Sequence, residues 1–104
     1  MVNTMTPDER NTVNLFKAAV NMIKTGPDGF PLANQGLELA VAARLALQVT
    51  RDCLRRGEPD AEQRSLMALT GTTSRLIEAT YDGNRDPAIP EKWFRARAEL
   101  VEPE

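Results

Sequence analysis

Hydrophobic residues recur at helical spacing in three long stretches of this chain, each bounded by proline or glycine. Thr6 and Glu9 have the spacing of a capping box, and the proline between them suits the first position of a helix. After this start, apolar side chains return every three or four residues at Val13, Phe16, Val20 and Ile23. The pattern predicts a first helix at about 7–24.

The second stretch, about 35–56, changes character along its length. Its C-terminal half is amphipathic, with apolar and basic residues on opposite sides of a helix. Its N-terminal half is apolar around the whole axis, through Leu37, Leu39, Ala40, Val41, Ala42, Ala43, Leu45, Ala46 and Leu47. Because a helix that is apolar all round is buried on more than one side, we expect several neighbours to cover it.

The third stretch, about 60–80, opens with acidic residues that suit the positive end of a helix dipole. Its middle, Thr70 to Ser74, consists of poor helix formers, which leaves open a kink, a close approach of a neighbour or a break into two helices. Pro90 or Glu91 then opens a short amphipathic helix at about 91–100. The predicted fold class is all-α, a small helical bundle of three long helices and a short C-terminal one.

The 104 residues fit one helical domain spanning 1–104, with frayed ends expected at 1–5 and 101–104. The connection at 25–35 is rich in turn signals, and we expect Phe30 and Leu32 to point inward from it. The N-terminus lacks the apolar segment of a signal peptide, and no stretch reaches the ~20 apolar residues of a membrane helix. We therefore expect a cytoplasmic protein without membrane contact.

The composition of the chain excludes several classes of catalytic and metal-binding site. The chain has no His and a single Cys, which excludes His-dependent nucleophiles, His-ligated metals and an internal disulfide. A formal net charge of −2 does not indicate binding of nucleic acid by bulk charge. We expect no enzyme activity, no catalytic residues, no metal and no cofactor.

Carboxylates in the predicted loops are the remaining candidates for catalysis or calcium binding: Asp28, Asp82, Asp86 and Glu91. Near glycine and proline, such groups usually cap their own turns. A calcium loop counted from Asp82 needs glycine at its sixth position and glutamate at its twelfth, where this chain has Pro87 and Trp93. Cys53 has the spacing of a buried core residue rather than a reactive thiol.

A basic stripe runs along the second predicted helix. Wound at 100° per residue, its members fall within about 60° of arc: Arg44, Gln48, Arg51 and Arg55. Such a stripe can follow the phosphates of a nucleic acid. Alternatively it is a solvated face, or it pairs with acids on the third helix or on another subunit.

The C-terminal segment carries the predicted partner-binding residues Trp93, Phe94, Arg95 and Arg97. Aromatic and Arg side chains dominate interface hot spots, and a terminal amphipathic helix often docks in a groove of a partner. The alternative is that this helix folds back over the apolar side of the second helix, in its own chain or in a neighbour. Loss of partner binding or loss of the fold in Trp93→Ala separates the two interpretations.

The apolar excess of the second helix predicts a homo-oligomer, most simply a two-fold dimer, with Leu37, Val41 and Leu45 in the oligomer surface or the core. The leading hypothesis is a non-enzymatic interaction protein, a small adaptor, assembly or regulatory subunit that binds a protein partner and itself. The alternative is a nucleic-acid-associated oligomer, such as a small phage packaging or regulatory subunit, that uses the Arg stripe. A third class, a small enzyme or ligand carrier, would need a pocket lined by Phe30, Leu37 and Met67.

Overall fold

Four helices make up the part of the chain that the computed structural model describes, residues 3–100. They are α1 (Pro7–Met22), α2 (Gly36–Arg56), α3 (Ala61–Asp82) and α4 (Ala88–Leu100). The predicted all-α class is confirmed over these residues, in which the β-type pairing is an isolated bridge between Thr25 and Pro31.

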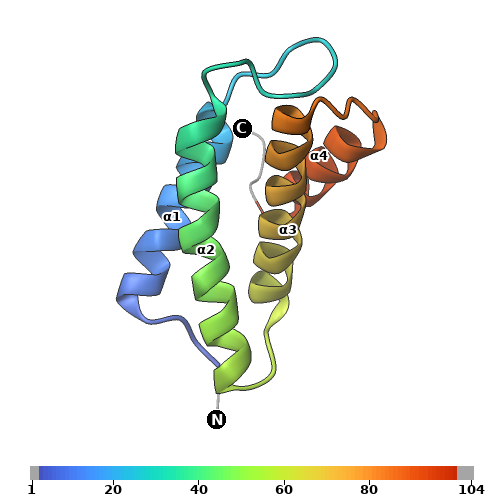
Figure 1. The fold of residues 1–104 in the computed structure, drawn as a ribbon. Helices are drawn as coiled ribbons and strands as arrows, with labels where there is room; N and C mark the ends of the chain where they lie inside the picture. Colours follow the sequence, from blue (N-terminus) through green and yellow to red (C-terminus); the bar gives the residue numbers. More distant parts are fainter. Residues whose placement is uncertain (1–2, 101–104) are drawn as a thin grey trace.

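The helix α2 lies between α1 and α3, and α4 packs against α3 (Figure 1). The helices α1, α2 and α3 alternate in direction along the bundle, so the 25–35 connection lies at one end and the α2–α3 turn at the other. All four helices contribute to one core, whose large fully buried side chains include Phe16, Leu39, Leu66, Leu69, Leu76 and Trp93. The interpretation in which the C-terminal helix covers α2 is therefore wrong for this chain, because α4 covers α3.

Side chains at two helix starts satisfy backbone N–H groups that have no partner within the helix. The predicted box of α1 is confirmed, with Glu9 N donating to Thr6 Oγ1 at 3.2 Å and Thr6 N donating to Glu9 Oε1 at 2.8 Å. In α3, Asp60 and Gln63 form a second box, since Gln63 N donates to Asp60 Oδ1 at 2.8 Å. These contacts fix where the two helices begin.

Three helix ends differ from the predicted ones by two or three residues: the end of α1, the end of α3 at Asp82 and the start of α4. The helix α1 stops at Met22 because Ile23 is extended and the next residues pair across the loop, where Leu32 N donates to Lys24 O at 3.0 Å. The helix α4 starts at Ala88, whose N–H donates to Asp86 Oδ1 at 3.0 Å. Pro90 fits within this first turn because no N–H is needed there, so it is not the boundary that the sequence suggests.

The Thr-rich middle of α3 remains one continuous helix, so the predicted alternative of two short helices is wrong. The Oγ1 atoms of Thr70 and Thr72 donate to carbonyl oxygens one turn earlier, at 2.9 Å to Met67 O and 2.9 Å to Ala68 O. Gly71 faces open space rather than a neighbouring helix, so the close approach of a neighbour does not apply at Gly71 itself, whereas Thr70 and Thr73 of the same patch are fully buried.

The predictions of frayed chain ends and of two inward-pointing residues in the 25–35 connection both need partial correction. Residues 3–5 are anchored, because Asn3 Nδ2 donates to Cys53 O at 2.8 Å and Met5 packs on the core. Residues 1–2 and 101–104 lie outside the described residues. In the 25–35 connection Phe30 is buried as expected, whereas Leu32 is exposed.

Candidate interaction surface on α1 and α2

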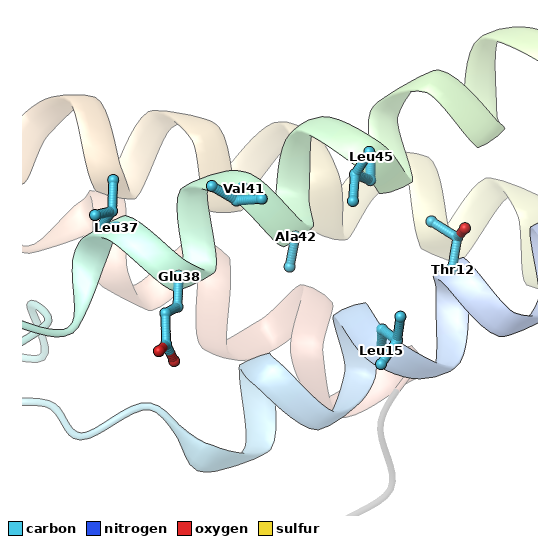
Figure 2. A pocket seen from close by; sticks show the side chains of 7 residues that line it. All are labelled: Thr12, Leu15, Leu37, Glu38, Val41, Ala42 and Leu45. Atoms are coloured by element: carbon cyan, nitrogen blue, oxygen red, sulfur yellow. The ribbon is translucent and has the colours of Figure 1, made fainter.

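An apolar groove runs along the outer side of the bundle between α1 and α2. Thr12 and Leu15 line it from α1, and α2 contributes Leu37, Glu38, Val41, Ala42 and Leu45. Figure 2 shows the α1 side chains across the groove from Ala42, with Leu37, Val41 and Leu45 along its α2 edge. Aliphatic groups make up most of this lining, and Glu38 is its charged member.

Helical spacing explains why α2 has apolar residues on both sides. Leu39, Ala43 and Ala46 point into the core, where they are buried. Leu37, Val41 and Leu45 follow one another four residues apart on the opposite side and are 71 %, 56 % and 53 % exposed. Of the two places predicted for these three residues, oligomer surface or core, the structure excludes the core.

The predicted Arg stripe lies on this same exposed side of α2. Arg44, Gln48, Arg51 and Arg55 are all exposed. Their partners are local: Gln48 Nε2 donates to Asp52 Oδ1 at 3.0 Å, and Arg55 Nη1 lies 3.3 Å from the same oxygen. Among residues 3–100, Arg44 and Arg51 form no ion pair. The exposed face of α2 is therefore apolar toward its N-terminus and basic toward its C-terminus.

The predicted partner-binding group on α4 is divided between core and surface. Trp93 is fully buried, and its Nε1 donates to Thr73 Oγ1 at 2.9 Å. The Phe94 ring packs edge to face against the Trp93 ring, with 4.8 Å between the ring centroids, and Phe94 is 39 % exposed. Arg97 stacks over Trp93 at 5.6 Å, and Arg95 pairs with Glu91 at 2.9 Å. Trp93 thus belongs to the core of its own chain and offers no surface to a partner.

Three of the four candidate carboxylates accept hydrogen bonds from nearby backbone, and the fourth, Glu91, lies in α4 and pairs with Arg95. Asp82 Oδ1 accepts from Asn84 N at 3.0 Å, and Asp28 Oδ1 accepts from Phe30 N at 3.1 Å. Asp86 caps the start of α4, as described above. Within residues 3–100, no group of three or more Cys, Asp or Glu side chains lies close enough together to hold a metal ion.

Cys53 is a buried core residue, as its spacing predicts. Burial raises the pKa of its thiol, and the negative charge of Glu9 adds to this effect. The nearby Arg56, whose Nη2 lies 3.5 Å from Sγ, opposes it. The neutral thiol is therefore favoured, which does not suit a nucleophile.

Two ion-pair groups between helices were not predicted from the sequence. Arg56 on α2 holds Glu9 on α1 at 2.7 Å, and Glu62 on α3 accepts from Arg10 at 2.7 Å with Lys17 at 3.8 Å. The side-chain hydrogen bond from Arg56 lowers the pKa of Glu9, and that from Arg10 lowers the pKa of Glu62. No short-range spacing reveals such pairs, because their members lie about fifty residues apart in the chain.

The three residues of the hypothetical ligand pocket lie on different elements: Phe30 in the 25–35 connection, Leu37 on α2, and the partly buried Met67 on α3. Phe30 is buried, with Arg85 stacked over its ring at 4.8 Å. Leu37 lies on the outer side of α2, where it lines the groove. This placement removes the basis for a pocket that Phe30 and Leu37 share.

Comparison of the chain with protein-family models, with curated proteins and with solved structures finds no match. Over residues 3–100, none of the helices combines the length and the apolar character needed to cross a membrane.

Proposed function

We propose that this protein is a non-enzymatic, cytoplasmic helical interaction protein that acts as a homo-oligomer, most simply a two-fold dimer. In this proposal it is an adaptor, assembly or regulatory subunit. One observation carries the proposal: Leu37, Val41 and Leu45 are each more than half exposed along an apolar groove. Contiguous apolar patches of this kind mark interaction sites on small domains.

The groove suits a helical surface as its occupant. Its apolar side chains recur at four-residue spacing on α2, and Leu15 of α1 closes the opposite edge. Ridges of this spacing pack into the grooves of another helix. Full burial of an exposed Leu or Val contributes roughly 1.5–3 kcal/mol, so the paired side chains of two copies supply a substantial driving force.

The central test is the variant Val41→Glu, which places a charge in the middle of the groove. We expect it to shift the protein to monomer in sedimentation velocity, because association would bury an unpaired carboxylate. Leu54→Glu is the matched control. Leu54 is 55 % exposed against 56 % for Val41, and it lies roughly 140° away around the same helix. Equal association of both variants, with circular dichroism showing intact helices, would contradict the proposal.

A second candidate function rests on the basic half of the same face. The row of exposed side chains at Arg44, Gln48, Arg51 and Arg55 can follow a phosphate backbone, and an oligomer multiplies that row. This candidate predicts salt-dependent binding to duplex DNA in a gel shift that Arg51→Glu abolishes. Arg95→Glu on α4 is the control and should leave binding unchanged. Absence of any shift at low salt would contradict the candidate.

A further inference from the structure

We infer that two copies of this chain pair through antiparallel α2 helices that cross near Val41, with Arg44 of each copy facing Glu78 of the other. This inference deepens the proposed homo-oligomer and rests on it. It follows from the order of apolar, basic and acidic side chains around the exposed face of α2.

The charge pattern along α2 decides the orientation. The apolar residues Leu37, Val41 and Leu45 share one face with Arg44, which lies among them, and Arg51 and Arg55 follow them toward the C-terminus. In a parallel pair, each Arg of one copy would lie beside the same Arg of the other copy, and the like charges would repel. In an antiparallel pair centred on Val41, Arg51 lies ten residues from the crossing, so the two Arg51 residues are about 30 Å apart along the axis. This distance exceeds the Debye length of about 10 Å at 0.1 M salt.

The antiparallel register also matches apolar side chains. Positions equally far from the crossing lie opposite each other, so Leu37 of one copy meets Leu45 of the other, and Val41 meets Val41. All three residues are exposed in the single chain, and association buries them together. The two-fold axis makes the Leu37–Leu45 contact occur twice, and the Val41–Val41 contact lies on the axis and occurs once.

Glu78 provides an opposite charge at the place that Arg44 of the other copy reaches. It lines a shallow groove between α2 and α3 together with Ala40 and Arg44. Tyr81, one helical turn later in α3, lies against Gly36 at the start of α2, so Glu78 is level with the first turns of α2. In the antiparallel pair, Arg44 of one copy is level with position 38 of the other copy. It lies on the side of α2 where α3 of that other copy packs. Arg75 Nη1 lies 3.4 Å from Glu78 Oε1 in the single chain, where the Arg75 side chain is 47 % exposed and the Glu78 side chain 70 % exposed.

Charge-reversed variants test this contact between copies. We expect Arg44→Glu alone and Glu78→Arg alone each to weaken self-association about tenfold or more, because each change creates two repulsive contacts. Mixing the two single variants should restore association as a heterodimer, in which both pairs are again of opposite charge. An effect confined to one chain cannot be rescued by mixing, so absence of rescue would overturn the inference.

Cysteine cross-linking tests the orientation independently. We expect Leu37→Cys mixed with Leu45→Cys to form a mixed disulfide, with the two variants distinguished by mass. Leu37→Cys alone should not cross-link to itself, since its two copies would be about 12 Å apart along the axis, beyond the ~7 Å Cα limit of a disulfide. The unchanged protein, which carries the buried Cys53, is the control.

Three outcomes are distinguishable. The mixed disulfide supports the antiparallel pair. Disulfides between identical positions, or a dimer that forms no disulfide at either site, would overturn this inference and leave the proposed oligomer standing. A monomer at every concentration in sedimentation would overturn the proposed function itself.

Discussion

Trp93 is buried and Val41 is exposed, although residue type alone suggests an interface position for Trp93 and a core position for Val41. The aromatic ring of Trp93 is in the core with its one polar atom bonded to Thr73, whereas Val41 is exposed. Trp and Arg are frequent in interface hot spots, but a buried Trp whose N–H has a partner fits a core equally well. The sequence could therefore identify Trp93 as important without indicating which surface it contacts.

Replacement of Trp93 by alanine should destabilise the fold rather than remove a binding surface. Loss of a large buried aromatic costs about 3–5 kcal/mol, a major part of the stability of a small domain. Urea unfolding followed by circular dichroism measures the loss. Phe94→Ala is the control and should cost less, because Phe94 is 39 % exposed. A Trp93→Ala protein as stable as the control would contradict the core assignment.

The two ion-paired glutamates should make stability depend on acidic pH. Hydrogen bonds from Arg56 and Arg10 lower the pKa of Glu9 and Glu62 below the ordinary value of 4.5. Their contribution is therefore fully present above the pKa of the unfolded chain and is lost as the pH falls through the lower folded pKa. Urea midpoints should drop between about pH 5 and pH 3. The Glu9→Gln/Glu62→Gln double variant should show a shallower drop, and an unchanged pH profile would contradict these pairings.

Among the helices, α3 shows where local propensity gives way to the surroundings. Its weak helix formers left a break open as one alternative, yet Leu69, Thr70 and Thr73 are all fully buried and hold the helix to its neighbours. Packing of this kind routinely overrides propensity. Gly71 remains a weak point of an otherwise well-packed helix.

Gly71→Ala should stabilise the protein. An added Cβ meets nothing within 4 Å, and alanine loses less backbone entropy than glycine in a helix interior, a gain of roughly 0.5–1 kcal/mol. Thermal unfolding should shift upward by a few degrees. Gly29→Ala is the opposite case, because Gly29 has a φ of +85° and its Cβ would lie 2.9 Å from Pro90 Cβ. Equal effects of the two substitutions would contradict the continuous helix at Gly71.

Most of each helix could be predicted from apolar spacing and from end signals such as the Thr6–Glu9 box. The exact ends could not, because Ile23 and Ala88 follow hydrogen bonds within the loops rather than residue preference. For the candidate site, the apolar excess around Val41 pointed to an uncovered surface. The sequence does not indicate which side of α2 remains uncovered, or that α4 packs against α3 rather than α2. Both depend on packing between distant segments of the chain.

At the scale of the whole molecule, residues 3–100 cover one side of α2 and leave the other open. The core side packs against α1 and α3, and the outer side carries an apolar half followed by a basic half. In the proposed pair, this face meets a reversed copy of itself. The proposed function therefore depends on association of the chain rather than on a pocket within it.

Sedimentation equilibrium of the unchanged protein over a range from low to high micromolar concentration tests this dependence most directly. The chain mass is 11.5 kDa, and we expect the fitted mass to rise with concentration toward twice that value. A constant mass of 11.5 kDa across the range would contradict the proposed oligomer.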